Sequence, residues 1–121
     1  ISLPVRSGSV DVSLLTDVIE HIRDDRSALL EMKRVLRTGG KALVTVPAFK
    51  ILWSKHDELN GHIRRYRRRE LISLVESCGL AVNSSWLLNR LLRNYFIMEE
   101  RLARSIPFPF GVSIALLCTK A

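Results

Sequence analysis

A strand, a helix and a second strand follow one another near the start of the sequence, and this order constrains the fold most. Residues 9–16 are mainly aliphatic and β-branched, which predicts a strand that is buried on both faces at its far end. Asp24 or Asp25 can cap the helix that follows, and Gly39 and Gly40 are expected to end it.

The segment after this helix completes a crossover unit. Residues 41–46 read Lys-Ala-Leu-Val-Thr-Val and predict a second buried strand, which Pro47 stops because proline cannot donate a hydrogen bond to a central ladder. A strand, a helix and a strand joined by tight turns form a right-handed parallel crossover. The sequence therefore predicts an α/β fold.

The rest of the sequence predicts a long connection and four further elements. Residues 48–69 are aromatic and basic without clear periodicity, and an extended connection of this kind inside a compact domain is usually functional or mobile. The expected elements are a helix over 70–78 that Gly79 stops, a strand over 81–87, an amphipathic helix over 88–105 and a strand over 112–119. We expect the last strand to insert antiparallel beside the one before it.

Composition limits the setting more than the function. The 121 residues suffice for one domain or a piece of one, and the loop-like opening at Ile1 predicts a fragment. A net charge of +7 favours anionic partners without identifying one. Cys78 and Cys118 form no C-x-x-C pair, so we expect buried free thiols and a cytoplasmic location. The 88–105 helix would also suit peripheral contact with a membrane surface.

Several short motifs occur in a consistent order. They are Leu-Pro at 3–4, Ser-Val-Asp at 9–11, Asp-Val-Ile-Glu-His-Ile at 17–22, Arg-Val-Leu-Arg-Thr-Gly-Gly at 34–40, His-Asp-Glu at 56–58 and Gly-His-Ile-Arg-Arg-Tyr at 61–66. In order and spacing the first four resemble the class I S-adenosylmethionine-dependent methyltransferases. The last two are similar to the substrate-side loop of their type 11 small-molecule branch.

The resemblance implies a Rossmann-like doubly wound sheet of which residues 1–121 form the carboxy-terminal half, parallel except for an antiparallel last strand. S-adenosylmethionine would be the cofactor of the complete protein. The family's glycine-rich cofactor loop would lie upstream of Ile1, so we expect this partial domain to be inactive alone. The apolar edge of the 9–16 strand would then be covered by the missing amino-terminal half or by a second copy.

Three histidines are candidates for a general base, should the methyl acceptor have to lose a proton: His21, His56 and His62. His21 could equally be a helix-entry residue bonded to backbone. Asp17 and Glu20 could contact the methionine end of the cofactor, although an aspartate at a strand end is also an ordinary helix cap.

The basic connection supplies the candidates for substrate binding: Asp57, Arg65 and Tyr66. Arg65 and Tyr66 could also be structural, and we expect residues 67–69 to be a solvated basic turn. The spacing of the histidines and acidic residues at 56–62 matches no zinc template, so no metal is expected. Arg67 replaces the hydroxyl residue that often caps the next helix, which should loosen its start by roughly 1 kcal/mol.

The sequence predicts a fragment of a methyltransferase that acts on a small-molecule acceptor. The alternative is a basic domain that binds nucleic acid or a membrane surface without catalysis. Nothing in the sequence other than its net positive charge supports nucleic-acid binding.

Overall fold

The computed structural model describes residues 2–83 and 113–121, in which four strands form one mixed sheet. The strands are β1 (Val10–Thr16), β2 (Leu36–Pro47), β3 (Leu80–Val82) and β4 (Ser113–Lys120), and their order in the sheet is β1-β2-β4-β3. β1 is parallel to β2, whereas β4 lies between β2 and β3 and is antiparallel to both. The expected α/β fold with an inserted antiparallel last strand is confirmed.

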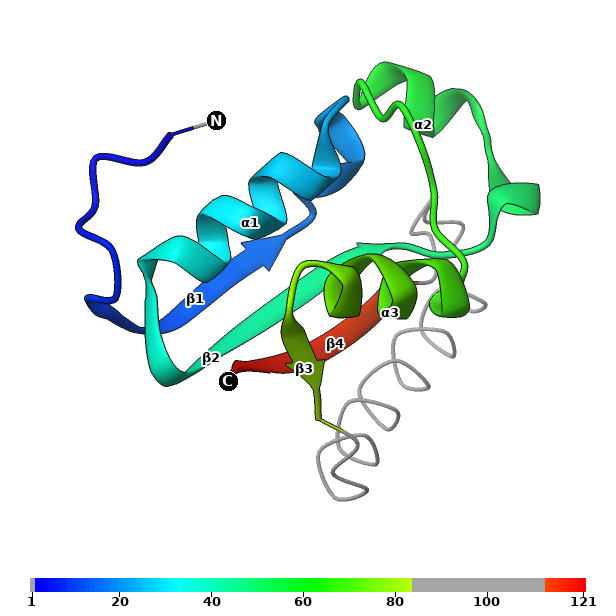
Figure 1. The fold of residues 1–121 in the computed structure, drawn as a ribbon. Helices are drawn as coiled ribbons and strands as arrows, with labels where there is room; N and C mark the ends of the chain where they lie inside the picture. Colours follow the sequence, from blue (N-terminus) through cyan, green and yellow to red (C-terminus); the bar gives the residue numbers. More distant parts are fainter. Residues whose placement is uncertain (1, 84–112) are drawn as a thin grey trace, which may run out of the picture.

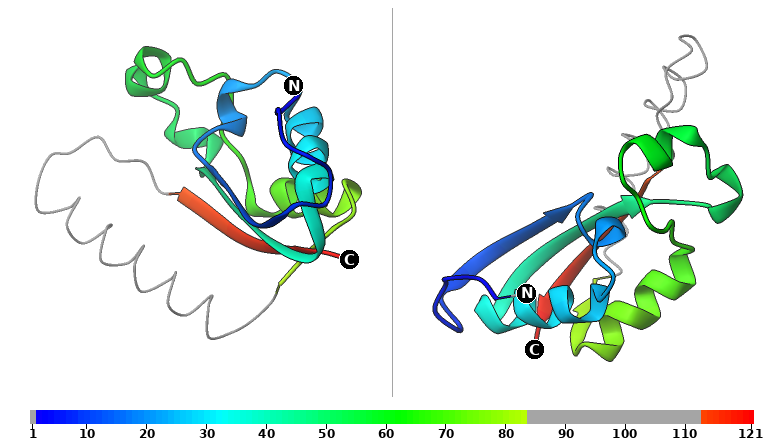
Figure 2. Two further views of the ribbon diagram at one scale, coloured as in Figure 1. Left: turned by 90° about the vertical axis from the view of Figure 1, so that its left-hand side faces the viewer. Right: turned by 90° about the horizontal axis from the view of Figure 1, so that it is seen from above.

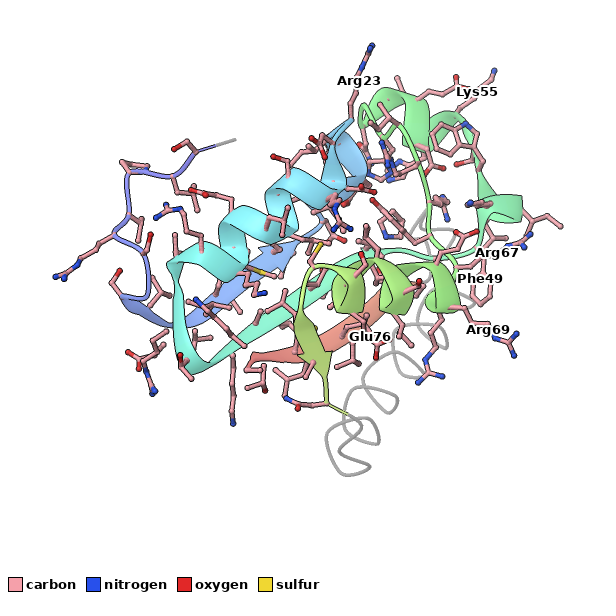
Figure 3. All side chains as sticks on the ribbon, in the orientation of Figure 1. Arg23, Phe49, Lys55, Arg67, Arg69 and Glu76 are labelled. Atoms are coloured by element: carbon pink, nitrogen blue, oxygen red, sulfur yellow. The ribbon has the colours of Figure 1, made fainter. Side chains whose placement is uncertain are left out.

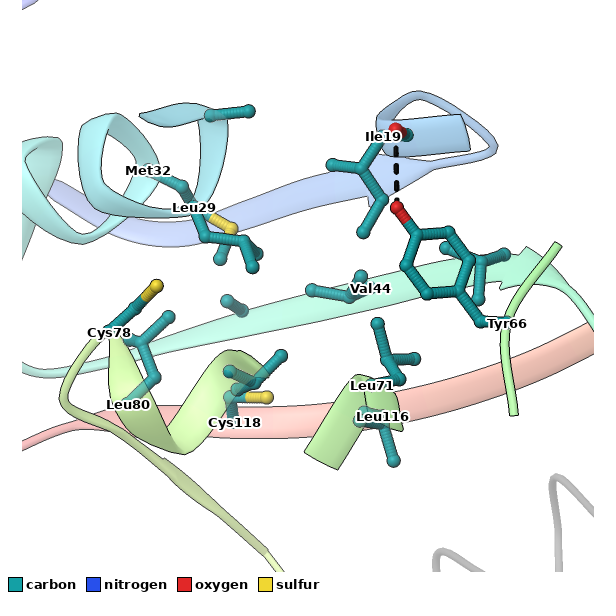
Figure 4. Packing of buried hydrophobic residues seen from close by; sticks show 14 of the residues in the cluster. Ile19, Leu29, Met32, Val44, Tyr66, Leu71, Cys78, Leu80, Leu116 and Cys118 are labelled. Atoms are coloured by element: carbon teal, nitrogen blue, oxygen red, sulfur yellow. Dashed lines mark hydrogen bonds between the residues drawn. The ribbon is translucent and has the colours of Figure 1, made fainter. Parts of the chain in front are cut away.

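Two helices cover one face of this sheet (Figures 1 and 2). They are α1 (Asp25–Val35) and α3 (Arg68–Ser77). Between them and the sheet lies the core, in which Val44 of β2 and Leu116 of β4 pack with Leu29 of α1 and Leu71 of α3 (Figure 4). Val44 and Leu116 lie on the face that the helices cover, because alternate side chains of a strand point to the same face.

The opposite face of β1 is open, which corrects the expectation of a strand buried on both faces. Val12 and Leu14 are 60% and 64% exposed. In the parallel register Leu14 lies beside Leu43, whereas Leu15 lies beside the buried Val44. Among the described residues, β1 pairs on one side only. It is therefore both an edge strand and a strand with one uncovered face.

The boundary between α1 and β2 also differs from the prediction. Asp24 is the cap, since its Oδ1 accepts a hydrogen bond from the Ser27 N–H at 2.9 Å. α1 ends at Val35, before Gly39 and Gly40, and β2 begins five residues earlier than residue 41.

The two glycines belong to an irregularity in the register between β1 and β2. Val10 pairs with Leu36 and Val12 with Lys41, so extra residues bulge from β2 at this point. Gly39 has a left-handed φ of 74°. A Cβ on Gly40 would lie 2.8 Å from the Arg37 carbonyl oxygen and 3.2 Å from that of Val10. Glycine at 40 therefore lets β2 pass close to β1.

The connection expected to lack regular structure contains two short helices. A 3₁₀ turn, η2, spans Lys50–Leu52, and α2 spans Lys55–Leu59. Ser54 caps α2 through its hydroxyl, while the Asp57 carboxylate accepts a hydrogen bond from the Ser54 N–H at 2.8 Å. α2 has five residues, too few for hydrophobic periodicity to reveal it.

The remaining predicted elements agree where they can be compared. α3 starts two residues before the predicted 70–78 helix, and Gly79 follows it with a φ of 75°. Arg67 makes no side-chain cap bond, but its N–H donates to the Glu70 carboxylate at 3.3 Å. The strand predicted at 81–87 is seen as β3, whereas residues 84–87 and the 88–105 helix lie outside the described residues.

Candidate functional site

The carboxyl ends of β1 and β2 lie at the same edge of the sheet, and the connection after β2 returns to this edge (Figure 1). Tyr66 forms a parallel bridge with Ala48, in which its N–H donates to the Pro47 carbonyl at 3.0 Å and its own carbonyl accepts from the Phe49 N–H at 3.1 Å. The residues between 48 and 66 therefore form a closed loop above the strand ends. A 3₁₀ turn, η1 (Ile19–His21), follows β1 on the same side.

Three side chains from these two segments come together. Glu20 and His21 belong to η1, and His62 follows α2. One potential ligand atom of each lies within 4.8 Å of those of the other two. The imidazole rings of His21 and His62 meet edge to face, with their centroids 4.8 Å apart. The backbone fixes this arrangement, since the Ile63 N–H donates to the Glu20 carbonyl at 2.9 Å.

Glu20 is the unusual member of this cluster. It has 0% exposure, and neither carboxylate oxygen has a hydrogen-bond partner among the described residues. Burial raises the pKa of Glu20 above its usual value, and the proximity of its own backbone N–H opposes this rise. The nearby charge of Asp17 acts with burial, whereas His21 and His62 act against it. An unpaired carboxylate at this depth is costly, so packing alone does not account for a glutamate at this position.

The two histidines are each held by one ring nitrogen. His21 Nδ1 lies 3.1 Å from the Gly61 carbonyl oxygen, and His62 Nδ1 lies 2.9 Å from Asp57 Oδ1. Both oxygens are acceptors, so each Nδ1 carries the proton and donates. In a neutral imidazole with this tautomer, the Nε2 atom carries the lone pair. His21 is exposed and His62 is partly buried, so the cluster reaches solvent on the His21 side.

Asp57 holds the basic connection together from within. Its side chain has 0% exposure and accepts hydrogen bonds from Arg65 Nε at 2.7 Å and from Arg65 Nη2 at 2.9 Å. These bonds from Arg65, with those from His62 and the Ser54 N–H, keep the pKa of Asp57 well below its ordinary range despite burial. Arg65 also donates to the Ala48 carbonyl at 3.1 Å.

Tyr66 has a similar internal position. It is 5% exposed, and its hydroxyl donates to Asp25 Oδ2 at 2.9 Å and lies 3.3 Å from the Ile19 carbonyl oxygen (Figure 4). Burial and the Asp25 carboxylate raise the pKa of Tyr66. Arg64 donates to the same Asp25 oxygen at 2.7 Å. The connection is thus joined to the start of α1 by Arg64 and Tyr66.

The other predicted site residues lie apart from the cluster or at its margin. Asp17 is exposed at the end of β1 with a left-handed φ of 52°, and Val18, not Asp17, is the N-cap of η1. The Nε2 atom of His56 lies 2.9 Å from the Asn60 side-chain nitrogen, within α2 and its cap. Residues 67–69 are exposed, and Arg67 and Arg69 point outward (Figure 3).

Sequence reasoning named every residue of the cluster but missed the grouping. It linked Glu20 with the cofactor and placed His62 with His56 and Asp57. Asp25, which anchors Arg64 and Tyr66, was expected only as a helix cap. The sequence contains a weak signal that Asp57, His62 and Arg65 act together, because all three fall in one motif-rich stretch. Their link to Glu20 depends on a contact that only the tertiary fold creates.

The sheet with its inserted antiparallel strand defines a Rossmann-like fold. Residues 1–44 match the family described as "Methyltransferase domain". A Mycolicibacterium smegmatis protein named "Probable S-adenosylmethionine-dependent methyltransferase" is 38% identical over 86 residues, which cover 69% of this chain and 33% of that protein.

A mouse protein, tRNA (carboxymethyluridine(34)-5-O)-methyltransferase ALKBH8, is 36% identical over 76 residues, covering 60% of this chain and 10% of that protein. A solved S-adenosylmethionine-dependent methyltransferase of Thermotoga maritima superposes with a TM-score of 0.67 at 18% identity, covering 99% of this chain and 60% of that chain.

The chain belongs to the class I S-adenosylmethionine-dependent methyltransferases. The cofactor of this family is S-adenosylmethionine. The chain spans a third of the length of the Mycolicibacterium relative. Within the described residues, no helix combines the length and the apolar character that crossing a membrane requires.

Proposed function

We propose that this chain forms the acceptor side of an S-adenosylmethionine-dependent methyltransferase whose acceptor is a small molecule. The observation that carries the proposal is the gathering of Glu20, His21 and His62 at the carboxyl ends of β1 and β2. In open α/β sheets, ligands bind in the crevice outside the carboxyl ends of the strands. The loop between residues 48 and 66 would form one wall of that crevice.

The residues present fit one side of a cofactor site. Asp17 is exposed at the end of β1, where its carboxylate can meet an ammonium group such as that of a methionine moiety. The Glu20 carboxylate is buried instead. Glu20 therefore fits direct contact with the cofactor less well than Asp17, and we assign the cofactor contact to Asp17. When bound, S-adenosylmethionine supplies a methyl group activated by its sulfonium.

Methyl transfer requires the acceptor's lone pair to lie in line with the carbon–sulfur bond that breaks, so positioning supplies much of the catalysis. A base is needed only where the acceptor must lose a proton. His21 fits that role better than the other histidines, because it is exposed and its Nδ1–H is fixed by Gly61. His56 lies within α2 and bonds Asn60, and Asp57 and Arg65 would position the loop without touching the acceptor.

A small acceptor is favoured over a macromolecule by the state of the arginines. Arg65 is buried against Asp57, and Arg64 bonds Asp25, so neither is free for a phosphate backbone. The exposed residues 67–69 remain available to anions. The name of the mouse relative gives tRNA as the acceptor of that protein. Methylation of tRNA is therefore the alternative that the experiments below must exclude.

Calorimetric titration with S-adenosylmethionine tests the cofactor half of the proposal. We expect a longer natural polypeptide that contains this chain to bind the cofactor, and Asp17→Ala to weaken binding. Asp11→Ala is the matched control, since Asp11 is an exposed aspartate near the other end of β1. If the longer polypeptide with the unaltered sequence does not bind S-adenosylmethionine, the proposal is wrong.

Release of S-adenosylhomocysteine in the presence of phenols, amines, sugars and tRNA tests the acceptor half. We expect turnover with a small molecule and a loss of turnover in His21→Ala. Turnover with tRNA alone, together with tRNA binding that falls steeply as salt rises, would instead show a nucleic-acid acceptor.

A further inference from the structure

We propose that Glu20, His21 and His62 bind a divalent transition-metal cation of the zinc class. The three residues supply one carboxylate and two imidazoles, with potential ligand atoms within 4.8 Å of one another. Imidazole and carboxylate together suit Zn²⁺ and its first-row neighbours, whereas Mg²⁺ prefers an all-oxygen site. Two protein histidines and one glutamate would leave a further coordination position open. Because the cation would occupy the Nε2 atom of His21, a water bound at that open position would then take the base role in place of His21.

The buried carboxylate is the first independent support. Both oxygens of Glu20 are buried and have no hydrogen-bond partner among the described residues. A buried carboxylate is stable when it is neutralised, paired or bound to a metal. A cation between Glu20 and the two imidazoles would provide the missing partner.

The hydrogen bonds of the two histidines are the second support. A histidine that binds a metal usually donates its other ring N–H to a carboxylate or a backbone carbonyl, which fixes the tautomer and the ring orientation. His62 donates its Nδ1–H to the Asp57 carboxylate at 2.9 Å, and His21 donates to the Gly61 carbonyl at 3.1 Å. In the neutral form of each ring, this tautomer leaves Nε2 as the atom that can bind a cation.

The rigidity of this outer layer is the third support. Asp57 is held by two hydrogen bonds from Arg65, so its orientation toward His62 is fixed before any cation arrives. The hydrogen bonds that orient the two histidines are therefore already formed. A small movement of the three side chains toward one another would allow each ligand atom to lie about 2.0–2.2 Å from a bound cation. This assignment replaces the expectation that the chain holds no metal.

Zinc titration of the purified 121-residue chain, after treatment with a chelator, tests the proposal. We expect one equivalent of Zn²⁺ to bind, and Co²⁺ in its place to give visible absorption bands that excess Zn²⁺ removes. Glu20→Gln and His62→Gln should each weaken binding by more than about 100-fold, because each removes a ligand rather than its support. His56→Gln is the matched control, and we expect it to change the affinity less than about twofold.

Thermal unfolding shows whether a variant that fails to bind zinc is still folded. In chelator, Glu20→Gln should melt at or above the temperature of the wild type, because it removes a buried unpaired carboxylate. Zinc should then raise the melting temperature of the wild type and of His56→Gln but not that of Glu20→Gln.

Zinc binding that is equal in the wild type and Glu20→Gln, or absent from the wild type at micromolar concentrations, would overturn the metal site. Because these measurements involve neither S-adenosylmethionine nor an acceptor, such a result would leave the proposed methyl transfer untouched.

Discussion

Arg65 and Asp57 form a two-pronged ion pair that is almost entirely removed from solvent, with side-chain exposures of 4% and 0%. Arg65→Ala would leave the Asp57 carboxylate buried without its principal counter-charge. We expect this change to lower the free energy of unfolding by roughly 3–5 kcal/mol. Urea unfolding of Arg65→Ala, Asp57→Ala and the double variant measures the effect.

In that series, the double variant should cost less than the sum of the two single variants, because neither charge is then left unpaired. Simple additivity, or a cost for Arg65→Ala below about 1 kcal/mol, would show that the pair is solvated in solution.

Glu31 provides a pH-dependent prediction. Two hydrogen bonds from Arg34 and one from the Leu3 N–H lower the pKa of Glu31 from 4.5 to about 2. A lowered folded-state pKa adds stability above the unfolded value and loses it as pH falls toward the folded value. We therefore expect the wild type to be more stable than Glu31→Gln near neutral pH.

This difference should shrink as pH falls from 4.5 toward 2, which urea unfolding at a series of pH values can follow. Glu58→Gln is a suitable control because Glu58 is exposed at the end of α2. If the difference in the free energy of unfolding between wild type and Glu31→Gln stays constant over this pH range, the pKa of Glu31 is not lowered in the folded protein.

The two cysteines should be unreactive in the folded protein. Cys78 and Cys118 are free and buried, as the sequence predicted. Burial also raises the pKa of the Cys118 thiol to about 11, which leaves little thiolate near neutral pH. A chromogenic disulfide reagent at about pH 8 should label neither cysteine in buffer and both in denaturant. Rapid labelling of the native chain would argue against this core.

The free edge of β1 predicts self-association. Val12 and Leu14 are exposed, and among the described residues β1 pairs with β2 alone. An exposed apolar edge strand is a template for pairing with another chain. We expect the 121-residue chain to associate with increasing concentration in sedimentation velocity, and Leu14→Lys to reduce this association.

Val5→Lys is the matched control for that experiment, since Val5 is an exposed apolar residue outside β1. A stably folded monomer at every concentration would mean that this edge needs no cover, from a second copy or from other polypeptide.

The sequence predicted the regular elements well where one physical signal dominated. The strand over residues 41–46 was recognisable because these residues are mainly aliphatic and β-branched, and β2 contains all six of them. Gly39 and Gly40 were misread because two glycines suit a helix end as well as a bulge. Only the position of Val10, whose carbonyl oxygen would lie 3.2 Å from a Cβ on Gly40, decides between the two.

The candidate site was predicted in its parts and not as a whole. Local spacing placed Glu20 and His21 at the end of a strand, which is where the structure has them. The contact of His62 with both depends on α2 and on the bridge between Ala48 and Tyr66, and neither has a periodic signal. Burial of the Glu20 carboxylate likewise follows from packing between distant segments.

The position of β4 has a consequence for biosynthesis. β3 has no sheet partner among the described residues other than β4, and β4 is the last of the four strands to leave the ribosome. β1, α1 and β2 can associate while translation continues, but the outer part of the sheet must wait for residues 113–120. Until then, the nascent protein exposes one edge of β2, and chaperone engagement should concentrate in that interval.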